Sequence, residues 1–177
     1  MRILSISTLL LVAGIVAGVT SAWHALDGSA LQAVKNGNGW QEWRLGTKDA
    51  MLPYTLGHFL SDGQVPPSSS ARYFVRSVDD QGNTLRGDCE FEVDGPASTS
   101  RWWTLSTGHD SGSALSAGKA VLDSKRRLKV VVSRFPVPGN WILPGTTGNY
   151  TLTYIVNEPA KAVALDLPHV KKIGCGA

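Results

Sequence analysis

Residues 85–93 read LRGDCEFEV, and this stretch decides the fold. Its odd-numbered positions carry apolar or small side chains, and its even-numbered positions carry arginine, aspartate or glutamate. Successive side chains of a β-strand point to opposite faces, so a period of two predicts a strand with one buried and one solvated face. Cys89 falls on the buried face.

Residues 73–78 are expected to form a further strand, and residues 127–132 and 150–156 share the period of two. The turn sequence DDQGN at 79–83 predicts a hairpin between the first of them and residues 85–93, and a second turn is expected at 123–126. We also expect a first short strand at 40–45 and a short helix at 50–60. A sheet with one solvated face needs a second layer packed against its apolar face. We therefore predict an all-β domain, an antiparallel β-sandwich of jelly-roll type.

A hydrophobic segment precedes this domain. Residues 3–22 contain no charged side chain, and twenty helical residues at ~1.5 Å each cover a hydrocarbon core of ~30 Å. Arg2 precedes the segment and Asp27 is the first charge after it, which favours a cytoplasmic N-terminus and an exported remainder. A cleaved signal peptide ending at Thr20-Ser21-Ala22 is the alternative. The run exceeds the usual ~7–15 apolar residues of a signal peptide, which favours an anchor.

We therefore divide the chain into a transmembrane anchor (or signal peptide) at 1–23, a tether at 24–39 and a single β-rich exported domain at 40–177. Without Arg2, 16 basic side chains face 14 acidic ones, a net of +2, which gives no electrostatic case for nucleic acid. The basic cluster at 125–127 is expected in a solvated turn. The two cysteines, Cys89 and Cys175, predict one disulfide in an oxidising compartment.

Several short motifs occur in a set order and spacing: YF at 73–74, DD at 79–80, RWWTLS at 101–106, PGNW at 138–141 and LPHV at 167–170. Together they resemble the bacterial family called domain of unknown function 1214, over roughly residues 70–175. The N-terminal anchor and the two cysteines are similar to the short, membrane-anchored members of that family. Its members tend to carry a tyrosine and an arginine where this chain has Gly108 and Ile155.

The resemblance implies a β-rich, jelly-roll-like domain, often encoded beside a protein that carries the related domain of unknown function 1254. It implies no established reaction. With the anchor, it leads us to expect a single-pass protein of the bacterial inner membrane, with residues 3–22 in the bilayer and the C-terminal domain in the periplasm.

The densest polar cluster is GHDSGS at 108–113, which contains the residue types of a serine hydrolase. His109, Asp110 and Ser111 are neighbours, whereas a catalytic triad draws its members from separate elements, so we expect a connecting loop. The four histidines are scattered singly, without metal-ligand spacing. We predict no metal and no cofactor, and we lean against an enzyme.

The tryptophans offer the other candidate site. Trp102 and Trp103 must face opposite sides of a strand, and we assign Trp103 to the core because it shares its side with Leu105. Trp102 must either be covered by other residues or line a groove. Trp141 lies in a proline-rich loop at 135–145, and we expect it to cover Trp102 in the first case and to form the second wall of the groove in the other. Packing is our main interpretation. The alternative is a glycan- or lipid-binding groove, with Arg101, Trp102, Asn140 and Trp141 as its ligand-binding residues.

These observations favour a non-enzymatic interaction module of the cell envelope. A ligand-binding domain using exposed tryptophans is the second hypothesis, and a hydrolase using His109, Asp110 and Ser111 is the third.

Overall fold

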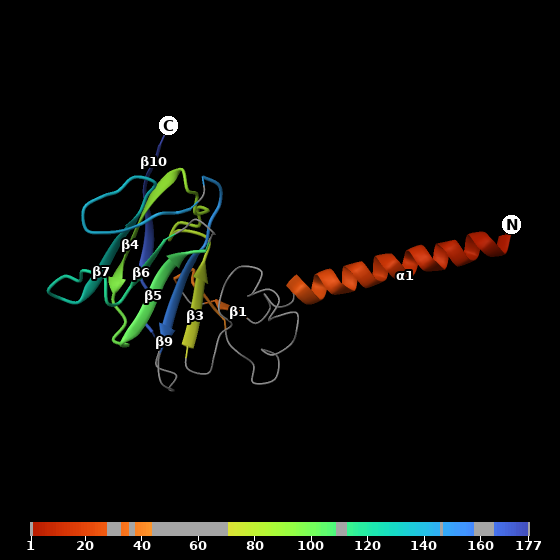
Figure 1. The fold of residues 1–177 in the computed structure, drawn as a ribbon, viewed down its shortest axis with the longest axis horizontal. Coiled ribbons are helices and arrows are strands. Elements are labelled where there is room, and N and C mark those ends of the chain that lie inside the picture. Colours follow the sequence, from red (N-terminus) through yellow and green to blue (C-terminus); the bar gives the residue numbers. More distant parts are fainter. Residues whose placement is uncertain are drawn as a thin grey trace.

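The structure, a computed structural model, describes residues 2–27, 33–35, 38–43, 71–108, 113–145, 147–157 and 165–176. These residues form one helix and ten strands, and Figure 1 shows the strands gathered into one β-domain. The short helix expected at 50–60 lies outside the described residues. The chain is therefore mainly β, as predicted.

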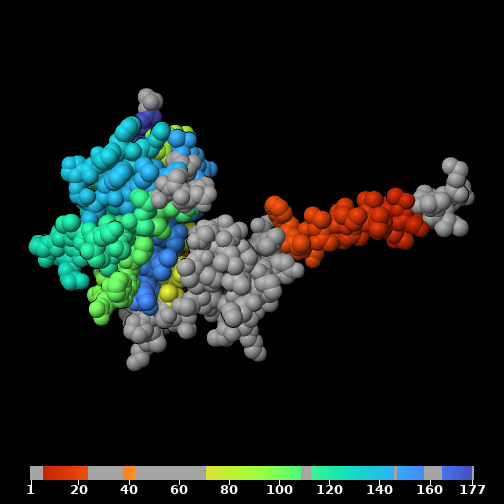
Figure 2. Space-filling view, in the orientation of Figure 1, coloured from red at the N-terminus to blue at the C-terminus, as the bar shows by residue number. Residues whose placement is uncertain are grey.

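Helix α1 (Arg2–Asp27) contains the hydrophobic segment. Its stretch Ile6–Trp23 is long and apolar enough to cross a membrane, a test that a signal sequence also passes, and none of it is buried in the protein. In Figure 2 the helix stands clear of the β-domain. The helix runs to Asp27, so the first residues of the predicted tether at 24–39 are helical.

The first sheet has six strands in the order β1 (Ala33–Lys35), β2 (Gln41–Trp43), β3 (Ala71–Arg76), β9 (Leu152–Asn157), β5 (Trp102–Thr107) and β6 (Ala114–Ser116). All of these neighbours pair antiparallel. β1 lies within the predicted tether, which is therefore partly built into the sheet.

The second sheet has four strands in the order β10 (His169–Cys175), β4 (Cys89–Pro96), β7 (Arg127–Val132) and β8 (Asn140–Ile142). β7 and β8 run parallel, so the predicted antiparallel sandwich contains one parallel pair. The predicted strands at 85–93, 127–132 and 150–156 correspond to β4, β7 and β9, with ends shifted by up to four residues.

Buried side chains from both sheets form one core between them. Phe74, Leu105 and Tyr154 come from the six-stranded sheet, and Phe91 and Val130 from the four-stranded sheet. Each of these side chains is at most 2% exposed. The alternation in the sequence thus buries one face of each sheet, as the hydrophobic effect requires.

The predicted hairpin between residues 73–78 and 85–93 is wrong as a strand pairing, although its turn forms. The N–H of Asp79 donates to the carbonyl oxygen of Asn83 at 2.8 Å, and that of Leu85 to Ser77 at 2.9 Å. β3 lies between β2 and β9, so both of its edges are occupied and β4 crosses to the other sheet. A period of two identifies a strand and its buried face, but it does not identify the neighbouring strands.

Candidate binding cavity and surrounding residues

Trp102 lies at the start of β5, on the outer face of the six-stranded sheet. The next residue, Trp103, is 4% exposed and packs in the core, so Trp102 points outward and is 63% exposed. The guanidinium carbon of Arg101 lies 5.9 Å from the centroid of the Trp102 ring, within the range of a cation–π contact. The prediction that the two tryptophans face opposite sides is confirmed.

Trp141 and Asn140 lie in β8 and not in the predicted loop. The indole N–H of Trp141 donates to the carbonyl oxygen of Ser133 at 2.9 Å. The Asn140 amide donates to the carbonyl oxygens of Lys129 at 2.9 Å and Val121 at 2.6 Å, and its oxygen accepts the Val121 N–H at 2.8 Å. Asn140 therefore holds the chain before β7 against β8, which is a structural role.

Both relations that we considered between Trp102 and Trp141 are wrong: Trp141 does not cover Trp102, which is 63% exposed, and the two indoles do not form a groove. Ile142, next to Trp141, is 1% exposed and belongs to the core, so Trp141 points outward from the four-stranded sheet. Trp102 points outward from the six-stranded sheet. The outer faces of the two layers of a sandwich point away from each other, so the two indoles cannot form opposite walls of one site.

A disulfide joins Cys89 and Cys175, which are paired residues of the neighbouring strands β4 and β10. Their Cα atoms lie 3.8 Å apart. Cys89 is 4% exposed, which confirms that it faces inward, whereas Cys175 is exposed. The bond fastens the last strand to the sheet and closes a loop across a separation of 86 residues.

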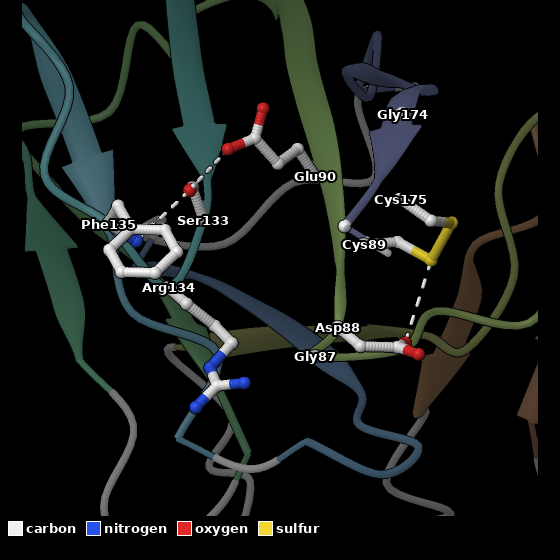
Figure 3. Close-up of a pocket in the computed structure, with 10 residues that line it drawn as sticks. Gly87, Asp88, Cys89, Glu90, Ser133, Arg134, Phe135, Gly174 and Cys175 are labelled. Carbon is white, nitrogen blue, oxygen red and sulfur yellow. Dashed lines mark hydrogen bonds between the residues drawn. A yellow bond between two sulfur atoms is a disulfide. The ribbon is translucent and has the colours of Figure 1, made fainter.

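A cavity of about 460 Å³ opens beside this disulfide (Figure 3). Gly87, Gly174 and Gly176 line it near the disulfide and add no side chains to fill it, while Arg134 and Phe135 approach from the chain that follows β7. Its volume lies within the ~300–1,000 Å³ that ligand sites occupy. It is a half-open cavity large enough for a small ligand.

Hydrogen bonds organise one wall of the cavity. The Ser133 hydroxyl donates to the Glu90 carboxylate at 2.7 Å and accepts the N–H of Phe135 at 3.2 Å. These bonds set the backbone so that the Phe135 ring, 73% exposed, stands at the rim. Ser133 is fully buried, so its hydroxyl holds this wall of the cavity together and does not face the cavity's solvent.

Charged groups give the cavity a mixed character. Asp88 pairs with Arg86, and the hydrogen bond from that guanidinium lowers the pKa of the Asp88 carboxyl. Glu90 supplies a second carboxylate and Arg134 a cation. One cation, two carboxylates and an aromatic ring suit a small polar ligand that combines a flat face with hydrogen-bonding groups.

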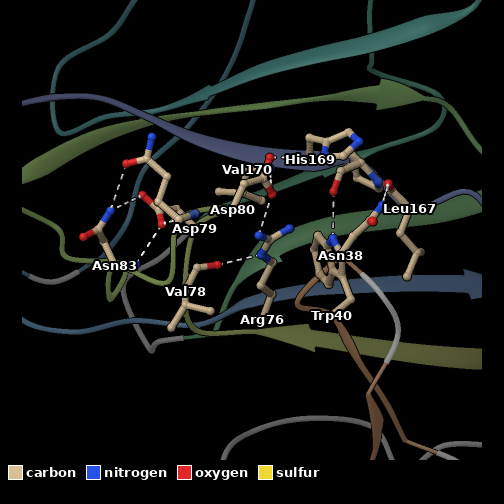
Figure 4. A network of polar contacts seen from close by, with 12 residues as sticks. Asn38, Trp40, Arg76, Val78, Asp79, Asp80, Asn83, Leu167, His169 and Val170 are labelled. Atoms are coloured by element: carbon tan, nitrogen blue, oxygen red, sulfur yellow. Dashed lines mark hydrogen bonds and ion pairs between the residues drawn. The ribbon is translucent and has the colours of Figure 1, made fainter.

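A second polar cluster surrounds Arg76, whose side chain is 1% exposed (Figure 4). Its guanidinium donates to the Asp80 carboxylate at 2.6 Å and to the carbonyl oxygen of Val78 at 2.6 Å. Asp80 also accepts the N–H of Val170 at 3.1 Å and lies 3.1 Å from Nδ1 of His169. Partial burial raises the pKa of Asp80, but the Val170 N–H, Arg76 and His169 outweigh it, so the pKa lies below its usual value.

The same cluster receives the segment that leads into β2. The Arg76 guanidinium carbon lies 5.9 Å from the Trp40 ring centroid, and the Trp40 indole N–H donates to the carbonyl oxygen of Pro168 at 2.7 Å. Gly39, at φ +76°, packs against the guanidinium, where a β-carbon would come within 3.2 Å of it. The cluster thus joins β2, β3 and β10 and has a structural role.

Sequence reasoning missed Ser133, Phe135 and Arg76 as residues of interest. Arg76 is the last residue of β3, and Ser133 and Phe135 follow β7, but only the folded chain brings Ser133 to Glu90 or Arg76 to Trp40. The pair Asp79-Asp80 was the one available signal, because consecutive aspartates after a strand suggest capping and ion pairing.

The predicted hydrolase residues His109, Asp110 and Ser111 lie outside the described residues. Within the described part, no group of three or more histidine, cysteine, aspartate or glutamate side chains is placed to hold a metal ion. His169 is the one histidine whose side chain the structure describes, and it pairs with Asp80.

No protein-family model and no curated protein matches the sequence. Solved structures similar to the chain include the VPA0106 protein from Vibrio parahaemolyticus, with a TM-score of 0.56 and 15% identity over 85% of this chain and 42% of that one. An uncharacterised protein from Burkholderia cenocepacia matches with a TM-score of 0.49 and 16% identity over 86% of this chain and 39% of that one. The chain spans about two fifths of the length of these structures. The first of them shares its fold.

Proposed function

We propose that the chain is a single-pass protein of the bacterial inner membrane whose β-domain lies in the periplasm and acts as a non-enzymatic interaction module. The observation that carries the proposal is the apolar helix Ile6–Trp23, none of which is buried in the protein. An exposed apolar surface of that length is costly in water, and a bilayer removes the cost. The disulfide supports an oxidising compartment on the domain's side.

We propose that the chain belongs to the family called domain of unknown function 1214, because its motifs resemble those of that family. The proposed partner is a protein that carries the related domain of unknown function 1254. Two of the buried polar side chains, Ser133 and Arg76, make hydrogen bonds that hold the fold together, which is consistent with an interaction role.

The anchor is tested on the full chain produced in bacterial cells. We expect the protein to stay in the membrane pellet at alkaline pH and to become accessible to protease only after the outer membrane is permeabilised. N-terminal sequencing separates anchor from signal peptide: a mature chain that starts at Trp23 rules out retention by this helix. A Leu10→Arg substitution in the middle of the helix should release the protein, whereas Trp23→Phe should not.

The interaction role is tested by co-purification from gently solubilised membranes with the proposed partner co-expressed. We expect a stoichiometric complex. Recovery of the chain alone at native abundance, with both proteins present and folded, contradicts the proposal.

A second candidate function is the binding of a small periplasmic ligand such as a glycan, favoured by the cavity beside the disulfide. Phe135 at the rim and the Glu90–Ser133 pair supply the flat surface and the polar groups that such a ligand needs. We expect glycan titration to change the fluorescence of Trp141, whose indole bonds to Ser133. Phe135→Ala should abolish this change and Trp102→Ala should preserve it. If Trp102→Ala abolishes the change and Phe135→Ala preserves it, the ligand binds at Trp102.

A further inference from the structure

One end of the β-sandwich gathers exposed basic and apolar side chains. Two loops meet there: residues 97–101, between β4 and β5, and residues 117–126, between β6 and β7. The N–H of Ala97 donates to the carbonyl oxygen of Arg126 at 3.1 Å, and that of Ala117 to Trp103 at 3.0 Å. We call this surface the basic end, and it consists of the exposed side chains Arg101, Trp102, Lys119, Val121, Lys125 and Arg126.

The basic end is amphipathic as well as cationic. Trp102 is 63% exposed and Val121 71% exposed, although both are apolar. The carboxylate within the longer loop, Asp123, accepts the backbone N–H groups of Lys125 at 2.8 Å and Arg127 at 2.7 Å. Asp123 therefore fixes the turn and is itself exposed, so the two loops carry four exposed cations against one carboxylate. Exposed tryptophan beside cations is typical of surfaces that meet the headgroup region of a membrane.

The register of the strands places the start of β1 at the same end of the six-stranded sheet as Trp102, with β2, β3 and β9 between β1 and β5. Pairing across the six-stranded sheet places Ala33 of β1 level with Thr104 of β5, and Lys35 level with Ser106. β1 therefore begins at the end of the sheet where Trp102 lies. Asp27 ends α1 and Ala33 lies six residues later, a distance that an extended chain spans with at most about 20 Å.

We infer that the basic end rests on the anionic phospholipid surface of the bilayer that holds α1. The inference depends on the proposed membrane anchor, and it adds the orientation of the domain and the surface that makes contact. Arg101, Lys119, Lys125 and Arg126 attract anionic headgroups, while Trp102 and Val121 enter the interfacial layer.

This orientation also has a consequence for the cavity beside the disulfide. β4 runs from Cys89, at the cavity, to Pro96, at the basic end, so the two features lie at opposite ends of the four-stranded sheet. The cavity then opens away from the bilayer, toward soluble ligands or partner proteins.

Photo-crosslinking of the full chain, reconstituted in vesicles of phosphatidylcholine with phosphatidylglycerol, tests the contact. The photoreactive residue p-benzoylphenylalanine replaces Trp102, Val121 or, as a matched control, Phe135, which is 73% exposed near the opposite end. We expect phospholipid adducts from positions 102 and 121 that are at least fivefold more abundant than from position 135. The combined substitution Arg101→Glu, Lys125→Glu and Arg126→Glu should reduce the adducts severalfold, as should pure phosphatidylcholine.

Alkaline extraction of the same vesicles keeps the two proposals apart. Protein that is released at alkaline pH overturns the membrane anchor itself. Protein that resists extraction but gives equal adducts from positions 102, 121 and 135 overturns the contact alone. The same probes in native membranes complete the test, since crosslinks from position 102 that go only to another protein also overturn the lipid contact.

Discussion

The indole N–H of Trp40 donates a hydrogen bond to the carbonyl oxygen of Pro168 at 2.7 Å. This bond joins the segment just before β2 to the residue just before β10, which are 128 positions apart in the chain. Trp40 is fully buried, and its ring also lies against Tyr154 and Arg76. The segment that leads into β2 is therefore fastened to the two layers of the sandwich through one side chain.

Replacing Trp40 should be among the most destabilising single changes. Trp40→Ala leaves a cavity and an unpaired Pro168 carbonyl, and we expect the free energy of unfolding to fall by about 3–5 kcal/mol. Trp102→Ala is the matched control, since that indole is exposed, and it should cost under about 0.5 kcal/mol. Urea denaturation followed by circular dichroism measures both, and equal losses would contradict the role of Trp40.

Asp80 should make stability sensitive to acid. Its pKa is lower in the folded protein than in the unfolded chain, so the ionised form contributes stability that is present at neutral pH. The contribution is lost as pH falls below the unfolded value of ~3.9 and through the folded pKa. Unfolding measured between pH 7 and pH 2 should show this decline.

Asp80→Asn tests the assignment of that decline. We expect a loss of roughly 2–3 kcal/mol at pH 7, below the ~3–5 kcal/mol of a fully buried pair, because Asp80 is partly exposed. The decline in acid should also become shallower. Asp166→Asn, at an exposed side chain, is the control and should reproduce the wild-type curve. If Asp80→Asn left the decline in stability at acid pH unchanged, other carboxyl groups would be its cause.

The disulfide should contribute substantially to stability. Closing a loop across the 86-residue separation of Cys89 and Cys175 constrains the unfolded chain by about 4–5 kcal/mol in the chain-entropy model. We expect Cys89→Ala, Cys175→Ala and the double variant to lose similar amounts, since each removes the same bond. Additive losses would show that the two side chains act independently.

Gly95 should resist substitution because of its close approach to Pro168, the residue just before β10. A β-carbon added there would lie 2.6 Å from the Cα of Pro168, so the backbone must shift. We expect Gly95→Ala to lower the free energy of unfolding by about 1–3 kcal/mol, as overpacking does. Gly118→Ala meets no atom within 4 Å and serves as the control in the same thermal melts. A Gly95→Ala protein as stable as the control contradicts this packing.

Sequence patterns predicted a large part of the fold because they depend on local geometry. Side chains alternate across any strand, so the burial of Cys89, Trp103 and Leu128 followed from the period of two. The pairing of β3 with β9 instead of β4 did not follow, because a strand's own pattern is the same whichever neighbour it has.

The candidate sites depended still more on the folded chain. Trp102 and Trp141 look alike in sequence, yet they lie on the outer faces of different sheets. The cavity beside the disulfide forms where the start of β4, the end of β7 and the end of β10 meet, and these segments are far apart in the chain.

The sequence by itself determined the apolar helix, the mainly β domain, the inward face of each main strand and the single possible disulfide. Each of these follows from hydrophobic patterning or residue count over a short stretch, where backbone geometry leaves few alternatives. Tertiary structure alone decided that Arg76 and Trp40 are buried together, and that Arg101, Lys119 and Arg126 share one end of the domain. Such contacts between distant residues are selected by the packing of the whole core and by loop closure, which no local pattern records.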